Sequence, residues 1–120
     1  MTTAFAATPE PPYYAVIFTS ERTPGDNGYG ETAQKMFGLA SSMPGYLGFE
    51  SARDAGGIGI AVSYWASEAD IARWKRQMDH LAAQESGKTR WYEHYELRVA
   101  RVERAYSGPA GRQVMPGAPE

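Results

Sequence analysis

Apolar and polar residues follow two different periods along this chain, and the switches between them mark six segments. A period of two with many aromatic and β-branched residues is typical of strands, whereas apolar steps of three and four are typical of helices. Short runs containing glycine or proline separate the segments and are typical of turns. In chain order the pattern predicts a strand at Tyr13–Ser20, a helix at Tyr29–Met43, strands at Tyr46–Arg53 and Ile58–Trp65, a helix that Ser67 begins and Gly87 ends, and a strand at Arg90–Arg104.

The order strand, helix, strand, strand, helix, strand predicts one α+β domain with a ferredoxin-like fold, βαββαβ. In that fold a four-stranded antiparallel sheet carries both helices on one face. The predicted strands are apolar on both faces, so the second face of the sheet also needs a cover. We therefore expect two copies of the chain to pair sheet to sheet as a homodimer.

We expect the domain to span residues 13–105, with a short extension at each end. Residues 1–12 end in Pro-Glu-Pro-Pro, and proline lacks the donor that a strand ladder needs, so they predict a flexible N-terminal arm. Residues 106–120 are rich in glycine and proline and have no periodicity, which predicts a disordered C-terminal tail.

Small residues mark two places where another group can approach the backbone closely. Gly59 and Ala61 share one face of a predicted strand, where they leave room for either a tightly packed helix or a ligand. Gly38 interrupts the helix predicted at Tyr29–Met43, where glycine costs about 1 kcal/mol relative to alanine. Its presence there favours a close approach of that helix to the sheet.

Tryptophans stand at the junction between the third strand and the second helix. Trp65 ends the strand, and Trp74 lies on the apolar stripe of the helix. Either the two rings close the joint between helix and sheet, or they wall a pocket for a flat aromatic ligand. Tyr64 and Trp91 would add to such a wall, so Trp65, Trp74, Tyr64 and Trp91 are the candidate substrate-binding residues.

Two histidines and a tyrosine are the candidate catalytic residues: His80, His94 and Tyr92. His80 lies off the apolar stripe of its helix. It is either a solvated side chain, a contact to a partner subunit or a proton shuttle at the rim of a pocket. His94 shares a strand face with Glu96 and Arg98, so it belongs either to a structural polar network or to a catalytic site. The histidines are fourteen residues apart without a third ligand nearby, so we predict no metal site.

Composition excludes several other classes of function. The 120 residues include no cysteine, and 12 basic against 14 acidic residues give a net charge of −2, which does not favour a nucleic-acid partner. No apolar run approaches the roughly 20 residues that a membrane span needs. The N-terminus has no signal-peptide pattern and no glycine-rich cofactor-binding motif occurs, so we expect a cytoplasmic protein without a bound cofactor.

Several motifs taken together resemble the antibiotic biosynthesis monooxygenase family, within the dimeric α+β barrel superfamily. The resemblance covers about residues 13–105 and implies a ferredoxin-like protomer whose sheet pairs with a second sheet to form a barrel. The motifs are Tyr29, Met36, Pro44-Gly45-Tyr46-Leu47-Gly48-Phe49-Glu50, Val62-Ser63-Tyr64-Trp65, His80, Ala83-Gln84, Gly87, Trp91-Tyr92, Tyr95 and Arg98-Val99.

The resemblance implies chemistry that needs neither a metal nor a flavin. In such enzymes a substrate that forms a stabilised carbanion reacts with oxygen directly, and the tryptophan that closes the third strand, here Trp65, lines the pocket. Haem-degrading relatives instead require an asparagine on the first strand and a histidine ten residues after the helix tryptophan. Here the first strand has no asparagine and Gln84 stands ten residues after Trp74, so haem degradation is disfavoured.

Three hypotheses on function follow from the sequence. The first is a cofactor-independent monooxygenase that oxidises a small phenolic, quinol or polyketide-like aromatic substrate. The second is a homodimer that binds a small aromatic molecule without catalysis. The third is an isomerase or cyclase of the same superfamily, which needs a base but no oxygen.

Overall fold

The computed structural model describes residues 5–26, 28–85 and 91–109. The predicted helix stop at Gly87, the predicted strand start at Arg90 and the tail residues 110–120 lie outside these ranges. The described elements, in chain order, are β1 (Tyr13–Arg22), α1 (Tyr29–Ser41), β2 (Tyr46–Arg53), β3 (Ile58–Trp65), α2 (Glu68–Glu85) and β4 (Tyr92–Val102).

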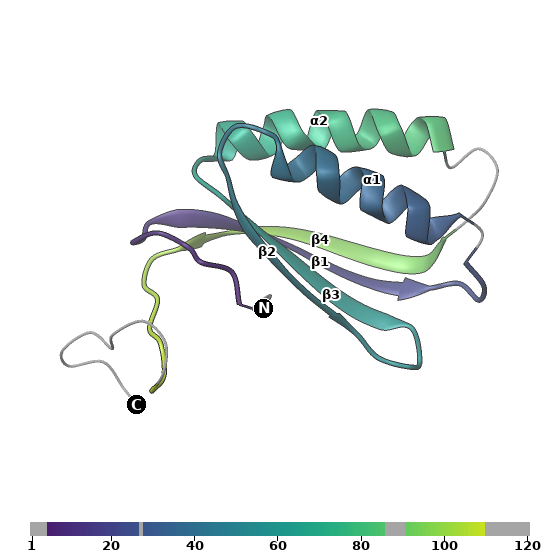
Figure 1. Cartoon of the computed structure of the whole chain (residues 1–120), viewed down its shortest axis with the longest axis horizontal. Helices are drawn as coiled ribbons and strands as arrows, with labels where there is room; N and C mark the ends of the chain where they lie inside the picture. The colour runs from purple at the N-terminus through teal and green to yellow at the C-terminus, as the bar shows by residue number, and fades with distance from the viewer. Residues whose placement is uncertain (1–4, 27, 86–90, 110–120) are drawn as a thin grey trace.

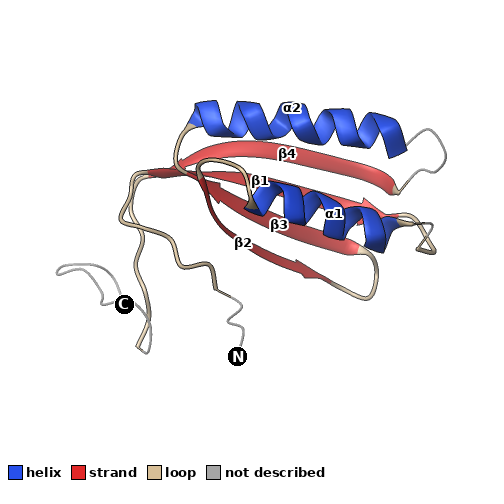
Figure 2. Ribbon diagram, turned by 45° about the horizontal axis from the view of Figure 1, so that its top comes forward, coloured by secondary structure: helices blue, strands red, loops and turns tan. Residues whose placement is uncertain are grey.

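The strands form one antiparallel sheet in the order β2-β3-β1-β4, and both helices cover the same face of it (Figures 1 and 2). The predicted ferredoxin-like α+β fold is therefore confirmed. Strand β1 lies inside the sheet, between β3 and β4. Each of the two crossovers that contain a helix leaves room for one strand between the two strands that it connects. Its Val16 is 2% exposed and anchors the core.

The core lies between the helices and the end of the sheet where β3 meets α2. Its buried side chains are Val16, Ala40, Trp65 and Ile71, and partly buried apolar residues pack around them. Trp65 and Val16 are its largest fully buried side chains. The core thus joins both helices to the two central strands.

A β-bulge changes the face on which Tyr92 lies. Glu21 of β1 pairs with His94, but the next residue, Arg22, pairs with Tyr92, so Glu93 is an extra residue in β4. Strict alternation along the sequence predicts that Tyr92 lies on the same face as His94, Glu96 and Arg98, and the register shows that this prediction is wrong. The bulge turns Tyr92 toward the helices and leaves His94 on the opposite face, because an extra residue reverses a period of two.

Helix α2 begins at the predicted capping box. The Ser67 hydroxyl accepts a hydrogen bond from the Asp70 backbone N–H at 3.1 Å and donates one to the Asp70 carboxylate at 2.8 Å. These contacts and the hydrogen bond from Arg73 lower the pKa of Asp70. Gly45, in the turn before β2, packs against the same carboxylate with a φ of 82°.

The face of the sheet away from the helices carries the N-terminal arm (Figure 1). The Ala6 backbone N–H donates to the Glu50 carboxylate at 2.9 Å, and Thr8 and Tyr13 share a hydrogen bond between their hydroxyls at 3.0 Å. Beyond the arm, Ile58 and Ile60 of β3 stay 46% and 49% exposed. No helix in the described ranges is long and apolar enough to cross a membrane.

Gly45 gives a direct test of the turn that sets the start of α2. Substitution Gly45→Ala is expected to lower the free energy of unfolding by at least about 2 kcal/mol. The reason is that an L side chain is strained at a positive φ and its Cβ would overlap the Asp70 carboxylate. Urea denaturation of both proteins measures the difference.

The control is the same substitution in α1, at Gly38. The structure places nothing within 4 Å of a Cβ at this position, so the predicted close approach of Gly38 to the sheet is wrong. Gly38→Ala should therefore stabilise the domain by about 0.5–1 kcal/mol, as alanine does in an open helix interior. Equal effects of the two substitutions would contradict the account of Gly45.

Candidate functional site

A pocket with a volume of about 1110 Å³ lies between the sheet and the two helices. Side chains from all four strands and both helices line it. Small residues on the helix-facing side of neighbouring strands, Ser51 of β2 with Ala61 and Ser63 of β3, leave the space open. Its size suits a small organic molecule, since ligand pockets commonly enclose about 300–1,000 Å³.

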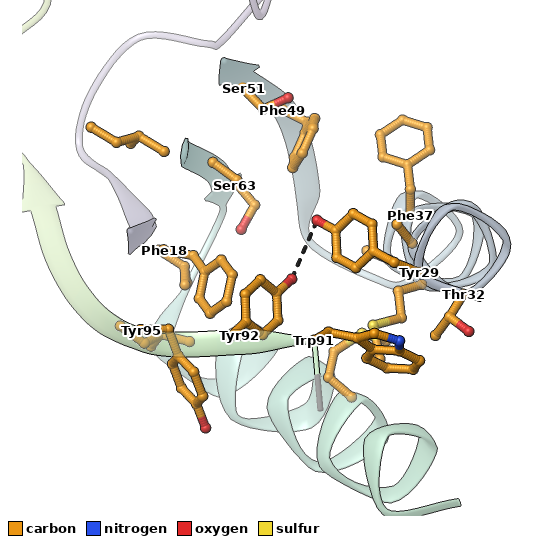
Figure 3. Close-up of a pocket in the computed structure, with 18 of the residues that line it drawn as sticks. Phe18, Tyr29, Thr32, Phe37, Phe49, Ser51, Ser63, Trp91, Tyr92 and Tyr95 are labelled. Atoms are coloured by element: carbon orange, nitrogen blue, oxygen red, sulfur yellow. Dashed lines mark hydrogen bonds between the residues drawn. The ribbon is translucent and has the colours of Figure 1, made fainter. Parts of the chain in front are cut away.

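One wall of the pocket is aromatic (Figure 3). The ring of Phe18 packs against Tyr92 and Tyr95 with centroids 5.3 Å away in both cases, and Tyr92 and Tyr95 are 5.9 Å apart. Tyr29, at the start of α1, packs edge to face on Tyr92 at 5.8 Å and on Trp91 at 6.3 Å. Contacts of this geometry hold the rings in fixed orientations.

Tyr29 and Tyr92 point their hydroxyl groups toward one another across the pocket (Figure 3). The Tyr92 hydroxyl donates to the Tyr29 hydroxyl with an oxygen–oxygen distance of 3.3 Å. Burial raises the pKa of Tyr92 and the hydrogen bond with Tyr29 raises it further, so Tyr92 stays protonated at neutral pH. The pair therefore offers the Tyr29 hydroxyl proton to a ligand, and Tyr92 does not act as a tyrosinate base.

Arg22 fixes the position of Tyr29. Its guanidinium carbon lies 3.6 Å from the centre of the Tyr29 ring, in a cation–π contact. Its Nε donates to the Trp91 carbonyl at 3.0 Å, and its Nη2 donates to the Gly25 carbonyl at 2.9 Å. One side chain thus ties the start of α1 to the segment before β4, which carries Trp91.

Trp74 supplies a donor that the protein itself leaves unused. Its indole Nε1–H is buried and has no acceptor among the described residues, while its side chain lines the pocket. An unpaired buried donor costs about 1–3 kcal/mol. A ligand oxygen placed beside it would remove that cost.

Trp65 lies in the core and not on the pocket wall. It is 0% exposed, its Nε1 donates to the Ser63 hydroxyl at 2.9 Å, and its ring centre lies 5.5 Å from that of Trp74. Ser63 and Trp74 line the pocket themselves. Trp65 therefore supports the pocket from behind by holding two lining residues in place.

The remaining predicted site residues divide between two faces of the sheet. Trp74, Trp91 and Tyr92 come together at the pocket. Tyr64 lies on the opposite face, where its hydroxyl donates to the Glu50 carboxylate at 2.8 Å. His94 is on that face too, with its side chain 70% exposed.

Neither predicted histidine lines the pocket. His94 pairs with Glu96 at 2.7 Å, as a polar contact on the surface. His80 is exposed on α2. Within the described ranges, no group of three potential ligands could hold a metal ion.

The lining residues that the sequence did not single out as site candidates include Phe18, Tyr29, Tyr95 and Arg53. Alternation along β1 groups Phe18 with Val16, but it does not say which face the helices cover. Tyr29 belongs to the predicted apolar stripe of α1, and that stripe was the available signal. Arg53 carried no signal, because a charged residue at a hairpin is most often solvated.

Substitutions of Trp65 and Trp91 distinguish a residue that supports the core from one that lines the pocket. Trp65→Ala is expected to lower the free energy of unfolding by about 3–5 kcal/mol, as for other buried aromatic residues. Trp91→Ala, at the partly exposed pocket wall, should lower the free energy of unfolding by a clearly smaller amount. Thermal and urea unfolding followed by circular dichroism measure both. A Trp65→Ala protein as stable as the wild type would show that Trp65 does not hold the core.

Comparisons with known proteins agree with the fold and identify the family. The sequence profile described as antibiotic biosynthesis monooxygenase matches residues 13–86. The chain is 56% identical over 97 residues to the uncharacterized protein YqjZ of Bacillus subtilis, covering 81% of this chain and 85% of that one. It is 29% identical to the jasmonate monooxygenase ABM of Pyricularia oryzae, over 74% of this chain but only 43% of the relative.

Solved structures share the fold at low sequence identity. PA3566 from Pseudomonas aeruginosa superposes with a TM-score of 0.59 at 13% identity, covering 81% of this chain and 98% of that chain. Rv0793 from Mycobacterium tuberculosis gives a TM-score of 0.57 at 16% identity, with coverages of 82% and 99%. With the profile match over more than half of its length, the chain belongs to the antibiotic biosynthesis monooxygenase family.

Proposed function

We propose that this protein is a monooxygenase that oxidises a small phenolic, quinol or polyketide-like aromatic substrate without a bound cofactor. The observation that carries the proposal is the aromatic pocket with its hydrogen-bonded pair Tyr29–Tyr92. Membership of the family supports oxygen chemistry. The aromatic wall supports a flat ring as substrate, because edge-to-face contacts can continue onto it.

The polar groups of the pocket favour a substrate that is itself acidic. Asp79 is the carboxylate among the described lining residues, and Lys75 holds it at 2.7 Å. The described lining residues therefore include no strong free base, so the substrate has to be acidic enough to lose its proton readily. The Tyr92 hydroxyl gives its one proton to Tyr29, so the Tyr29 hydroxyl is the hydrogen-bond donor to the enolate or phenolate oxygen that forms, which stabilises the developing charge.

The reaction balances without an external reductant. In an anthrone, the methylene carbon loses both hydrogens and becomes a carbonyl. One atom of O₂ enters the product, the other leaves as water with those hydrogens, and the substrate supplies every electron. The protein then has to bind the ring, favour its anion and keep bulk water away from it.

Oxygen uptake with an anthrone and a hydroquinone tests the proposal. The wild type should consume O₂ with these compounds, and Tyr29→Phe should lower kcat/KM about 10²-fold, because it removes the donor to the developing anion. Jasmonate belongs in the panel because a relative named jasmonate monooxygenase is 29% identical to this chain over 93 residues. An oxygen electrode and product mass spectrometry give the readout.

The matched control is Tyr95→Phe on the same wall. The Tyr95 hydroxyl points away from the Tyr29–Tyr92 pair (Figure 3), so this variant should keep its activity. Turnover that is absent across the panel, or equal in wild type and Tyr29→Phe, would contradict the proposal.

The second candidate is a protein that binds an aromatic molecule without converting it. The lack of a free base among the described lining residues favours it, because the same pocket could then bind but not deprotonate a weakly acidic ligand. Ligands would raise the melting temperature while no oxygen is consumed. That outcome would replace the monooxygenase proposal.

We also infer that two copies pair through the sheet face away from the helices. Ile58 and Ile60 are about half exposed there, and Ile60 lines a shallow apolar depression together with Val62 and Phe5. Apolar side chains on an open sheet face are stabilised when a second sheet covers them. The arm, held at Glu50, would lie at the edge of that interface.

Light scattering tests the pairing. The wild type should have the mass of two chains at micromolar concentration, and Ile60→Glu should weaken the dimer strongly, because it buries a carboxylate between sheets. Ala72→Glu, on the exposed side of α2, adds the same charge away from that face and should stay dimeric. A monomeric wild type would contradict the inference.

A further inference from the structure

Arg53 lies in the pocket because Gly59 leaves room for it. The two residues are cross-strand partners in the β2–β3 hairpin, and the Arg53 guanidinium lies over the glycine. A Cβ at position 59 would come within 2.5 Å of the Arg53 Cζ, 2.8 Å of its Nη2 and 2.9 Å of its Nε. The guanidinium of Arg53 therefore occupies the space at Gly59, which is neither covered by a helix nor left open.

Neutral groups hold this guanidinium in place. Nη1 donates to the Gly57 carbonyl at 2.5 Å, and Nη2 donates to the hydroxyl of Ser20 at 2.8 Å. Ser20 is 3% exposed, so the anchor is a buried one. The Nε–H and one Nη2–H make no hydrogen bond to the described residues.

Arg53 is the cation of the pocket that no described carboxylate neutralises. Lys75 and Asp79, which also line the pocket, pair with each other at 2.7 Å. The ion pairs in the described part of the chain do not include Arg53. An arginine with free N–H groups and no counter-ion favours an oxyanion, which a guanidinium can bind with two hydrogen bonds.

The aromatic wall lies beside this cation. Ser20, which anchors Arg53, pairs with Gly59 on one side and with Tyr95 on the other. The positive charges of Arg53 and Arg22 act on Tyr92 and partly oppose the rise of its pKa. A ring held against Tyr92 and Tyr95 can therefore direct a substituent toward Arg53.

We propose that Arg53 is a specificity-determining residue that binds a carboxylate on the ring substrate, and that Gly59 and Ser20 position it. This inference rests on the proposed function, since it assigns the orientation of a ligand in the same pocket. The substrate class narrows to ring compounds with one carboxylate that is ionised at neutral pH. Neutral rings of the same shape then bind more weakly.

Calorimetric titration of the full chain with 2-naphthoate and with 2-naphthamide tests the inference. The two probes share their ring and differ in charge. The wild type should bind the naphthoate about tenfold more tightly than the amide, as a charge-assisted pair of hydrogen bonds allows. In Arg53→Gln the ratio of the two Kd values should fall to about one, with the amide affinity unchanged.

Two further variants distinguish the effect of the position of the Arg53 guanidinium from the effect of removing a positive charge. Gly59→Ala keeps the arginine but displaces its guanidinium, so it should also lose most of the preference. Arg76→Gln removes a charge from the exposed side of α2 and should keep the full preference. Because the ratio is measured within each variant, a change in stability alone does not alter it.

The outcomes distinguish this inference from the proposed function. Equal binding of both probes by the wild type, or a preference that survives in Arg53→Gln, overturns the role of Arg53 and leaves the aromatic pocket intact. No binding of either probe at millimolar concentration overturns the aromatic pocket itself, and the role of Arg53 with it.

Discussion

The burial of Trp65 is the interaction on which the rest of this structure depends. Its ring fills the core where β3 ends and α2 begins, in contact with Tyr46 from β2 and Trp74 from α2. Its one polar atom is satisfied by Ser63, two residues away on the same face of the strand. A tryptophan side chain buries about 200 Å², and Trp65 is one of the two largest fully buried side chains of this small core. The helix is therefore held over the sheet at the end next to Trp65, and the pocket opens where this support ends.

The pocket depends on a second constraint, which is the extra residue in β4. Without the bulge at Glu93, Tyr92 would face away from the helices together with His94. With it, Tyr92 meets both Phe18 on the neighbouring strand and Tyr29 on α1. The bulge therefore converts a strand end into part of the aromatic wall. β-Bulges often aim a side chain at a functional site in this way.

The chemistry of the pocket is that of donors and one unpaired cation rather than of bases. The hydroxyl of Tyr29, the indole N–H of Trp74 and the guanidinium of Arg53 all have N–H or O–H groups that can donate to a bound molecule. Such a set stabilises negative charge on a bound molecule, and it does so without reorganising during the reaction. For oxygen chemistry on an anionic substrate this is the favourable arrangement, because the electrons come from the substrate.

The sequence by itself determined the type and order of the elements, the ferredoxin-like fold and the capping of α2 by Ser67. These follow from local periods and from residues close together in the chain. Only the tertiary structure decided that Trp65 is core, that Tyr92 faces the pocket while His94 does not, and that Arg53 lies over Gly59. The face of Tyr92 depends on the pairing of β4 with β1, a strand distant in sequence. The place of Arg53 depends on the register of the β2–β3 hairpin, and the burial of Trp65 depends on its packing with Tyr46 and Trp74. Alternation tells which residues share a face, but the face that the helices cover and the position of an extra residue are settled only when the strands meet.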